Sequence, residues 1–261
     1  MLTTDQRTAA AELLRQAEHD RVPVKPLAQL YPDLDVVDAY EIQLVNIRRR
    51  VDRGAVVVGH KVGLSSLAMQ RMMGVDEPDY GHLLDDMRLH EGTPARAADY
   101  CYPRVEVEVA FLLGADLPGE GCTEQDVLAA TEAVAPSIEL IDSRIVDWRI
   151  GLVDTIADNA SSAGFVLGAD RVPPSEVDLR TIDARLRKGG EVLVEGRSDA
   201  VLGNPVVAVA WLAAKVAGFG VRLRAGDVVL PGSCTRAVDV HAGDSFHAEF
   251  DGLGTVSLSF G

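Results

Sequence analysis

The sequence predicts an α+β fold in which a small helical N-terminal region precedes a longer, strand-rich region. Three observations lead to this prediction. Near the N-terminus, apolar residues recur at the spacing of amphipathic helices. From Tyr102 onward, most segments have the patterns of strands. No internal repeat, low-complexity linker or run of charge interrupts the 261 residues. We therefore expect a helical region over residues 1–54 and a β-rich domain over residues 55–261.

Two helices and one short strand are expected in the first part of the chain. Thr4 is a suitable N-cap for a first helix, whose apolar residues lie between positions 9 and 14. A second helical pattern follows Asp38 and runs to Ile47. The character changes after Gly54, where Ala55-Val-Val-Val-Gly59 has the pattern of a buried strand.

Two hairpins and one helix are expected in the second half. The stretch "ARLRKGGEVLVEG" predicts a hairpin that turns at Lys188-Gly189-Gly190. The stretch "FHAEFDGLGTVSLSF" predicts another hairpin, which turns through Asp251-Gly-Leu-Gly254. Between these hairpins, Asn204 is expected to cap a helix that begins at Pro205 and ends near Gly218 or Gly220.

Composition excludes several classes of partner. The formal net charge is -15, which disfavours binding to nucleic acid or to an anionic membrane. The N-terminal residues lack the pattern of a secretory signal, and the apolar stretch from Val206 to Phe219 is interrupted by Lys215 and short for a bilayer. Three cysteines have no metal-like spacing. We therefore expect a cytoplasmic protein with free thiols and no nucleic-acid or membrane partner.

The stretch "PRVEVEVAFLLG", residues 103–114, places acids on a strand that becomes fully apolar. Valines alternate with Glu106 and Glu108, so one face carries two carboxylates about 7 Å apart. A buried carboxylate must be protonated, salt-bridged or bound to a cation. Glu139 is a third acid among apolar residues, after Pro136-Ser137, for which we expect a turn.

Three carboxylates without a neighbouring His or Cys cluster suit a hard ion such as Mg²⁺ or Mn²⁺. The alternative is structural. In that interpretation Glu106 and Glu108 are solvated at a sheet edge, and Glu139 forms an ordinary salt bridge.

A second group of candidates lies in "VVVGHKVGLSS". Lys61 stands between Gly59 and Gly63 after an apolar run, where burial would lower its pKa and suit it to proton transfer. Asp79, in an expected turn, is a candidate partner. The alternative is a surface lysine and a turn-capping aspartate. We interpret His60 and His82 as packed side chains rather than ligands.

Seven motifs occur in order over nearly the whole chain: "GHKVGLSS", "EPDYGHLLDDM", "PRVEVEVAFLL", "PSIELID", "DTIADNASSAGFVLG", "VLGNP" and "LRAGDVVLPGSCT". Together they resemble the 2-hydroxypenta-2,4-dienoate hydratase and 4-oxalocrotonate decarboxylase family, within the fumarylacetoacetate hydrolase-like superfamily. The "LPGSCT" motif departs from the threonine-glycine version of the more distant hydrolases, which weakens the case for carbon–carbon bond hydrolysis.

The resemblance implies a mixed β-roll of the fumarylacetoacetate hydrolase C-terminal-like type, with a small helical N-terminal region. It also implies a Mg²⁺ or Mn²⁺ ion held by three acids, acid-base chemistry by two residues, and two residues beside the substrate. A homo-oligomer is implied as well, and association with a downstream aldolase is a further expectation. The residues concerned are Glu106, Glu108 and Glu139 for the metal, Lys61 and Asp79 for catalysis, and Ser161 and Asn159 for the substrate.

The expected reaction is the addition of water to a 2-hydroxydienoate from aromatic or steroid ring catabolism, with the ion acting as a Lewis acid at the 2-oxygen. Two alternatives remain: decarboxylation of 2-oxo-3-hexenedioate, or a non-catalytic partner subunit. A decarboxylase must hold a second carboxylate, and the sequence does not place Arg71, Arg104 or Arg144 in space. The length of the substrate tail also remains open.

Overall fold

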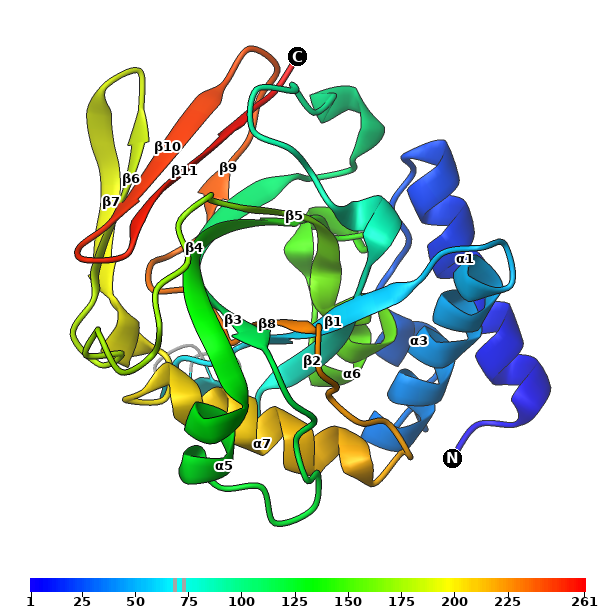
Figure 1. The fold of residues 1–261 in the computed structure, drawn as a ribbon. Helices are drawn as coiled ribbons and strands as arrows, with labels where there is room; N and C mark the ends of the chain where they lie inside the picture. Colours follow the sequence, from blue (N-terminus) through cyan, green and yellow to red (C-terminus); the bar gives the residue numbers. More distant parts are fainter. Residues whose placement is uncertain (68–69, 72–73) are drawn as a thin grey trace.

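The computed structural model describes residues 1–67, 70–71 and 74–261 and confirms the α+β prediction (Figure 1). Its α-helices are α1 (Thr4–Asp20), α2 (Leu27–Leu30), α3 (Val36–Val51), α5 (Glu124–Ala130), α6 (Leu152–Ala157) and α7 (Pro205–Ala217). Its strands are β1 (Val57–Gly63), β2 (Asp79–Leu84), β3 (Arg104–Leu113), β4 (Thr131–Ile141), β5 (Ser162–Leu167), β6 (Asp183–Lys188), β7 (Glu191–Arg197), β8 (Val228–Leu230), β9 (Val238–Asp239), β10 (Ser245–Phe250) and β11 (Gly254–Ser259). Short 3₁₀ helices are η1 (Asp85–Met87), η2 (Ala97–Asp99), η3 (Val146–Trp148), η4 (Asn159–Ser161) and η5 (Ser198–Ala200).

The larger sheet curls into a roll. Its strand order is β2-β1-β8-β3-β4-β5, with β9 paired to β3. The two ends of this order approach each other, because the segment after β2 bridges to β5: Leu89 N donates to Phe165 O at 2.8 Å. Figure 1 shows the strands arranged around a central space, with α7 and α5 below it and α1 and α3 to one side.

The two predicted hairpins are confirmed and together form the smaller sheet, of order β11-β10-β6-β7. Gly189 and Gly190 lie between β6 and β7 with φ of 58° and 88°. Positive φ at both central residues of a two-residue turn matches the right-handed twist of the flanking strands. This sheet stands beside the roll in Figure 1.

Both N-terminal helices begin one to three residues before the predicted positions. Thr3, not Thr4, caps α1: its hydroxyl accepts from Gln6 N at 3.2 Å, while the Gln6 side chain accepts from Thr3 N at 2.9 Å. Asp35 caps α3 by accepting from Asp38 N at 2.8 Å. Asp38 lies inside the helix rather than before it, because Asp35, three residues earlier, is the cap.

The predicted helix after Asn204 is confirmed as α7. The Asn204 side chain accepts from Val206 N at 3.2 Å, Pro205 occupies the first turn, and Gly218 is the C-cap. Together with η5 the segment Ser198–Ala217 has a mean hydropathy of 1.6 and is long enough to span a membrane by length and composition alone. Much of α7 is instead buried in the protein core, which accounts for its apolar character.

One predicted strand boundary and two predicted turns were wrong. β1 begins at Val57 rather than Ala55, and Val56 is exposed. Asp79 does not lie in a turn but opens β2, opposite Gly63. Pro136-Ser137 does not turn either, because both residues lie within β4. Pro136 is tolerated there because its nitrogen, like its carbonyl, faces the side on which β5 has ended, so the missing N–H costs no hydrogen bond between strands. The Pro136 carbonyl accepts from Gly168 N at 2.8 Å.

The inside and outside of the roll differ in character. Val105 and Val107 on β3 belong to a core that also includes Leu14 of α1, so the N-terminal helices share a core with the strands. A domain boundary near residue 54 stays a prediction. On the other face of β3, Glu106 and Glu108 precede Ala110, which belongs to a separate apolar cluster within the roll.

Candidate active site and metal centre

Three glutamates converge on the inner face of the roll. Glu106 on β3 lies directly opposite Glu139 on β4, because β3 and β4 are antiparallel neighbours in this register. Glu108 shares the face of Glu106 two residues further along β3. One carboxylate oxygen from each lies within 4.8 Å of the others. The structure therefore brings all three sequence-predicted metal ligands together.

The surroundings of Glu108 and Glu139 rule out solvated edge acids at these two positions, whereas Glu106 is half-buried. Glu108 and Glu139 are fully buried. Gly232 N donates to Glu108 Oε2 at 2.7 Å, and the Ser162 hydroxyl donates to Glu139 Oε1 at 2.8 Å. Among the described residues, Glu108 Oε1 has no hydrogen-bond partner, and Glu139 Oε2 has only the Lys61 ammonium, as an ion pair at 3.4 Å. The expected salt bridge of Glu139 is thus present, but among the described residues it leaves Glu139 Oε2 without a hydrogen bond.

Burial disfavours the ionised form of all three acids, and repulsion between neighbouring carboxylates adds to this at Glu106 and Glu108. Burial raises the pKa of Glu106 to about 7, and Glu139 adds to this while Lys61 opposes it. Burial also raises the pKa of Glu108, with Glu139 and Glu106 adding to the effect. The pKa of Glu139 is raised by burial as well, against the opposing charge of Lys61. Crowded carboxylates with free oxygens are a donor set that fits a hard divalent cation.

Lys61 lies on β1 with its ammonium among these acids. The side chain is buried, and Nζ donates to Ala160 O at 2.9 Å. The expectation of a lowered pKa was wrong. Burial does act to lower the pKa of Lys61, but the charges of Glu139 and Asp79 outweigh burial and raise it. The sequence indicated the burial but not the distant Glu139.

Asp79 opens β2 opposite Gly63 and lies close to Lys61 of β1. Thr155 Oγ1 donates to Asp79 Oδ2 at 2.7 Å, and Asp79 Oδ1 has no partner among the described residues. A Cβ added to Gly63 would lie 2.2 Å from Asp79 Oδ1 and 2.9 Å from Lys61 Nζ. Gly63 therefore leaves the space in which these two side chains meet. The alternative of a turn-capping Asp79 and a surface Lys61 was wrong.

The segment after α6 adopts an unusual backbone. Asn159, Ala160 and Ser161 have φ of 54°, 50° and 57°, a left-handed conformation that is costly for such residues. This turn aims the Ala160 carbonyl at Lys61 and leaves the buried Ser161 hydroxyl without a partner among the described residues. Strain of this kind persists only where surrounding contacts impose it.

Asn159 and Ser161 have different positions relative to the site. Asn159 exchanges two hydrogen bonds with the backbone of His82: Oδ1 accepts from His82 N at 2.8 Å and Nδ2 donates to His82 O at 2.9 Å. Its side chain thus holds the strained turn against β2. Asn159 is not among the described residues that line the cavity described next, and its direct contact with substrate stays a prediction. Ser161 does face the cavity described next.

A cavity of about 390 Å³ opens beside Lys61, Asp79 and Glu106. Its wall combines hydroxyls with apolar side chains and one guanidinium. The lining includes Ser65, Ser66, Arg104, Ile141, Trp148, Ile150, Thr155, Ser161, Ser233, Thr235 and Ala237. The volume suits a small organic acid.

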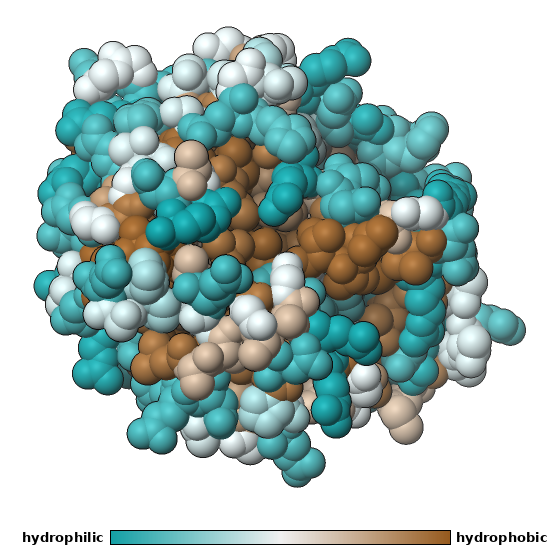
Figure 2. Space-filling model, in the orientation of Figure 1, coloured by the Kyte–Doolittle hydropathy of each residue, from teal (hydrophilic) through white to brown (hydrophobic). Residues whose placement is uncertain are grey.

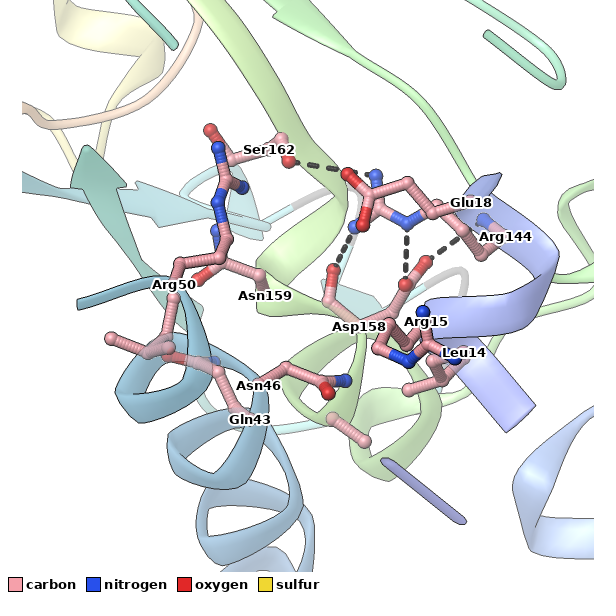
Figure 3. Close-up of a pocket in the computed structure, with 12 residues that line it drawn as sticks. Leu14, Arg15, Glu18, Gln43, Asn46, Arg50, Arg144, Asp158, Asn159 and Ser162 are labelled. Atoms are coloured by element: carbon pink, nitrogen blue, oxygen red, sulfur yellow. Dashed lines mark hydrogen bonds and ion pairs between the residues drawn. The ribbon is translucent and has the colours of Figure 1, made fainter. Parts of the chain in front are cut away.

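The three arginines that the sequence could not place are now located. Arg104 lines the 390 Å³ cavity, whereas Arg71 is exposed and does not. Arg144 is buried against Asp158, with Nε donating to Asp158 Oδ1 at 2.6 Å. Figure 3 shows this ion pair beside a separate small hollow of about 40 Å³ between the N-terminal helices and the strained turn. Arg144 is therefore structural.

His60 and His82 pack together with ring centroids 4.8 Å apart, as expected of core histidines. Burial lowers the pKa of His82 to about 4, and burial together with the neighbouring His82 lowers the pKa of His60 well below its ordinary value. Both imidazoles are therefore neutral near pH 7.

Several residues of the site were missed from the sequence: Thr155, Ser162, Gly232 and Trp148. Each reaches the site through folding rather than through a local pattern. Thr155 and Ser162 belong to the quoted motif "DTIADNASSAGFVLG" and Gly232 to "LRAGDVVLPGSCT", which were the available signals.

Comparison with known proteins gives three findings. Residues 86–259 match the model of the fumarylacetoacetate (FAA) hydrolase C-terminal family. The chain is 42% identical over 259 residues to a 2-keto-4-pentenoate hydratase of Paraburkholderia xenovorans (strain LB400), covering 99% of this chain and 96% of that one. It is 43% identical over 251 residues to a 2-hydroxyhexa-2,4-dienoate hydratase of Comamonas testosteroni, covering 95% of this chain and 94% of that one.

A solved structure is also similar throughout. The 4-oxalocrotonate decarboxylase from Pseudomonas putida G7, complexed with magnesium and adipate, has a TM-score of 0.95 and 38% sequence identity to this chain. The match covers 100% of this chain and 99% of the decarboxylase. The resemblance of fold thus includes the N-terminal helices as well as the roll.

Proposed function

This chain belongs to the fumarylacetoacetate hydrolase family, and from that premise we propose that it is a hydro-lyase acting on 2-hydroxypenta-2,4-dienoate or a slightly longer 2-hydroxydienoate. The product is a 4-hydroxy-2-oxo acid. The observation that carries the proposal is the convergence of three glutamates, a buried Lys61 and Asp79 on one cavity of about 390 Å³. Relatives at 42–43% identity are named hydratases.

Glu106, Glu108 and Glu139 would hold a divalent cation, for which we propose Mg²⁺ or Mn²⁺. Support comes from their all-oxygen donor set and from the magnesium in the structure of the decarboxylase relative. When bound, such an ion supplies Lewis-acid stabilisation of negative charge at the substrate 2-oxygen and offsets the charge of the three carboxylates.

Proton movement falls to the chain's own residues. The 2-hydroxyl must lose a proton and the far carbon, C5, must gain one, which gives an α,β-unsaturated 2-oxo acid. Water then adds its oxygen to C4 and a proton to C3. We assign the proton-carrying role to Lys61: its raised pKa makes it an ammonium at the start, so it delivers its proton to C5, and the amine left behind takes the proton of the 2-hydroxyl. Asp79, fixed by Thr155, is its charged partner, and the free Ser161 hydroxyl is positioned to bind the substrate.

Decarboxylation of 2-oxo-3-hexenedioate is the second candidate. Its specific support is the 38% identity to the decarboxylase and the presence of Arg104 in the cavity. A non-catalytic partner subunit is the third reading. The arrangement of Lys61 and Asp79 around the glycine space argues for chemistry rather than for a scaffold alone.

The cellular setting follows as a proposal. We place the enzyme in the cytoplasm, in the breakdown of aromatic or steroid rings, with no nucleic-acid or membrane partner. Free thiols at Cys101, Cys122 and Cys234 support this compartment. We also propose a homo-oligomer, which can associate with a downstream aldolase. Figure 2 shows apolar side chains in a band across one face, which a second subunit could cover.

One assay tests the function. Purified protein with Mg²⁺ is mixed with 2-hydroxypenta-2,4-dienoate, and loss of the dienoate ultraviolet absorbance is followed. In a parallel reaction the protein is mixed with 2-oxo-3-hexenedioate, and release of CO₂ is measured. We expect rapid loss of the dienoate and no CO₂. Release of CO₂ with an inert dienoate would assign the decarboxylase instead, and inactivity toward both would overturn the enzymatic proposal.

A further inference from the structure

We propose that the outer end of the cavity selects substrates whose tail carries no charge, because Asp239 already neutralises the one guanidinium that lines it in the described residues. The inference rests on the proposed function and deepens it. It names the class of tail that the same site accepts, and it identifies Asp239 as the positioning residue that sets this preference through Arg104.

Arg104 lies where a substrate tail would end. Arg104 and Glu106 are two residues apart on β3, so they share the inner face at a spacing of about 7 Å. Both line the cavity. A 2-oxo acid whose carboxylate end lies at the three glutamates can therefore extend its carbon chain along β3 toward Arg104.

The charge of Arg104 is already compensated. β9 pairs with β3 so that Asp239 lies directly opposite Arg104. Arg104 Nε donates to Asp239 Oδ1 at 2.7 Å, and the guanidinium carbon lies 4.5 Å from the centroid of the Trp148 ring. A carboxylate entering from the cavity would have to share Arg104 with Asp239 and would lie close to that negative charge.

The rest of the outer wall favours hydrocarbon. Ile141, Trp148 and Ile150 line the cavity there. Trp148 is held in place, since its Nε1 donates to Tyr102 O at 3.2 Å. An apolar tail gains by leaving water against such side chains, whereas a carboxylate loses hydration and gains only a guanidinium that Asp239 already pairs.

A second hollow adds negative charge beyond this wall. It has a volume of about 370 Å³, and both Arg104 and Trp148 line it as well. Asp147 and Asp239 are the acids on its lining. A dicarboxylate long enough to pass Arg104 would therefore approach two carboxylates.

The test uses two unreactive acids that differ only at the far end. 2-Oxohexanoate ends in a methyl group, and 2-oxohexanedioate ends in a carboxylate. Binding of each to the Mg²⁺-saturated protein is measured by titration calorimetry. We expect the wild type to bind 2-oxohexanoate more tightly, by roughly 10-fold. Tighter binding of 2-oxohexanedioate would overturn the inference.

Substitution of Asp239 then tests the cause. Its side chain is 70% exposed, so Asp239→Asn should fold normally. The variant frees Arg104, and the affinity ratio should shift toward 2-oxohexanedioate by roughly 10-fold. In the double variant with Arg104→Gln the gain should disappear. No shift in Asp239→Asn, or a gain that survives Arg104→Gln, would contradict the inference.

Asp147→Asn is the matched control. It removes the same charge from the same hollow but leaves the pair of Arg104 and Asp239 intact. Asparagine also tolerates the φ of 55° at this position. The ratio should stay near that of the wild type; a shift as large as that of Asp239→Asn would show a general field effect and overturn the inference. If neither acid binds with Mg²⁺ present, the proposed function itself fails and this inference with it.

Discussion

Lys61 holds its ammonium among carboxylates, and two substitutions separate its possible roles. Lys61→Met should lower kcat by about 10²- to 10⁴-fold, the usual contribution of a positioned acid-base group, while Mg²⁺ binding persists. Lys61→Arg keeps the charge but cannot give up its proton near neutral pH. The measurement is kcat across pH at saturating Mg²⁺. A near wild-type rate for Lys61→Arg would show that Lys61 only anchors charge.

Glu106 makes a separate prediction about pH. Its folded pKa of about 7 lies above the ordinary value of 4.5. The protonated form is thus favoured in the fold, so its contribution to stability is full below about pH 4.5 and is lost as pH rises through 7. Glu106→Gln is permanently neutral. The measurement is the Tm of Glu106→Gln minus the Tm of the wild type, both with a chelator present. This difference should increase as the pH is raised from 5 to 8.

The same variant has an opposite effect on metal binding. Glu106→Gln removes one anionic ligand, so Mg²⁺ affinity and turnover should fall together while the fold survives. Calorimetric titration with Mg²⁺ and the dienoate assay measure the two quantities. Full activity after exhaustive chelation, with no metal detected by elemental analysis, would refute the metal proposal.

The sequence identified the acids and bases of the site because their types are unusual in their local patterns. Glu106 and Glu108 interrupt an apolar strand, and Lys61 stands between glycines. Their energetic setting could not be predicted, because it depends on partners far along the chain. Thr155 lies 76 residues from Asp79 and Gly232 lies 124 residues from Glu108. No local pattern encodes such contacts.

At the scale of elements, α7 offers a test of capping that is independent of the site. Asn204→Ala removes the side chain that accepts from Val206 N. The free energy of unfolding should fall by about 1 kcal/mol, as for other lost N-caps. Urea denaturation measures this, and Mg²⁺ affinity serves as the control because α7 supplies no ligand. An unchanged midpoint would show that the cap is dispensable.

Elements with self-contained signals were predicted well, and those that depend on distant neighbours were not. The hairpin at Gly189-Gly190 and the cap at Asn204 are encoded within a few residues. β2 was taken for a turn because Asp79-Tyr-Gly81 has turn composition. Gly81 is in fact a site of close approach, where a Cβ would lie 2.5 Å from Asn159 O.

At the scale of the whole molecule, the proposed homo-oligomer predicts a particle several times the mass of one chain. The support is a set of exposed large apolar side chains on the helices and loops, which include Val22, Leu30, Val37, Val51, Val56 and Leu128. Light scattering during size-exclusion chromatography measures the mass. A particle of one chain at micromolar concentration would contradict the proposal, and the activity of that particle would show whether one chain suffices.

The position of β8 has a consequence for the order of events during synthesis. Residues 228–230 form the strand that joins β1 to β3, parallel to one and antiparallel to the other. Lys61 and the glutamates of β3 are therefore joined through neighbouring strands only after β8 has left the ribosome. The protein must close contacts of long sequence separation late, which slows folding and leaves strand edges open meanwhile. A nascent chain that ends before β8 carries all three glutamates on β3 and β4, but it lacks the strand that joins β1, and with it Lys61, to β3.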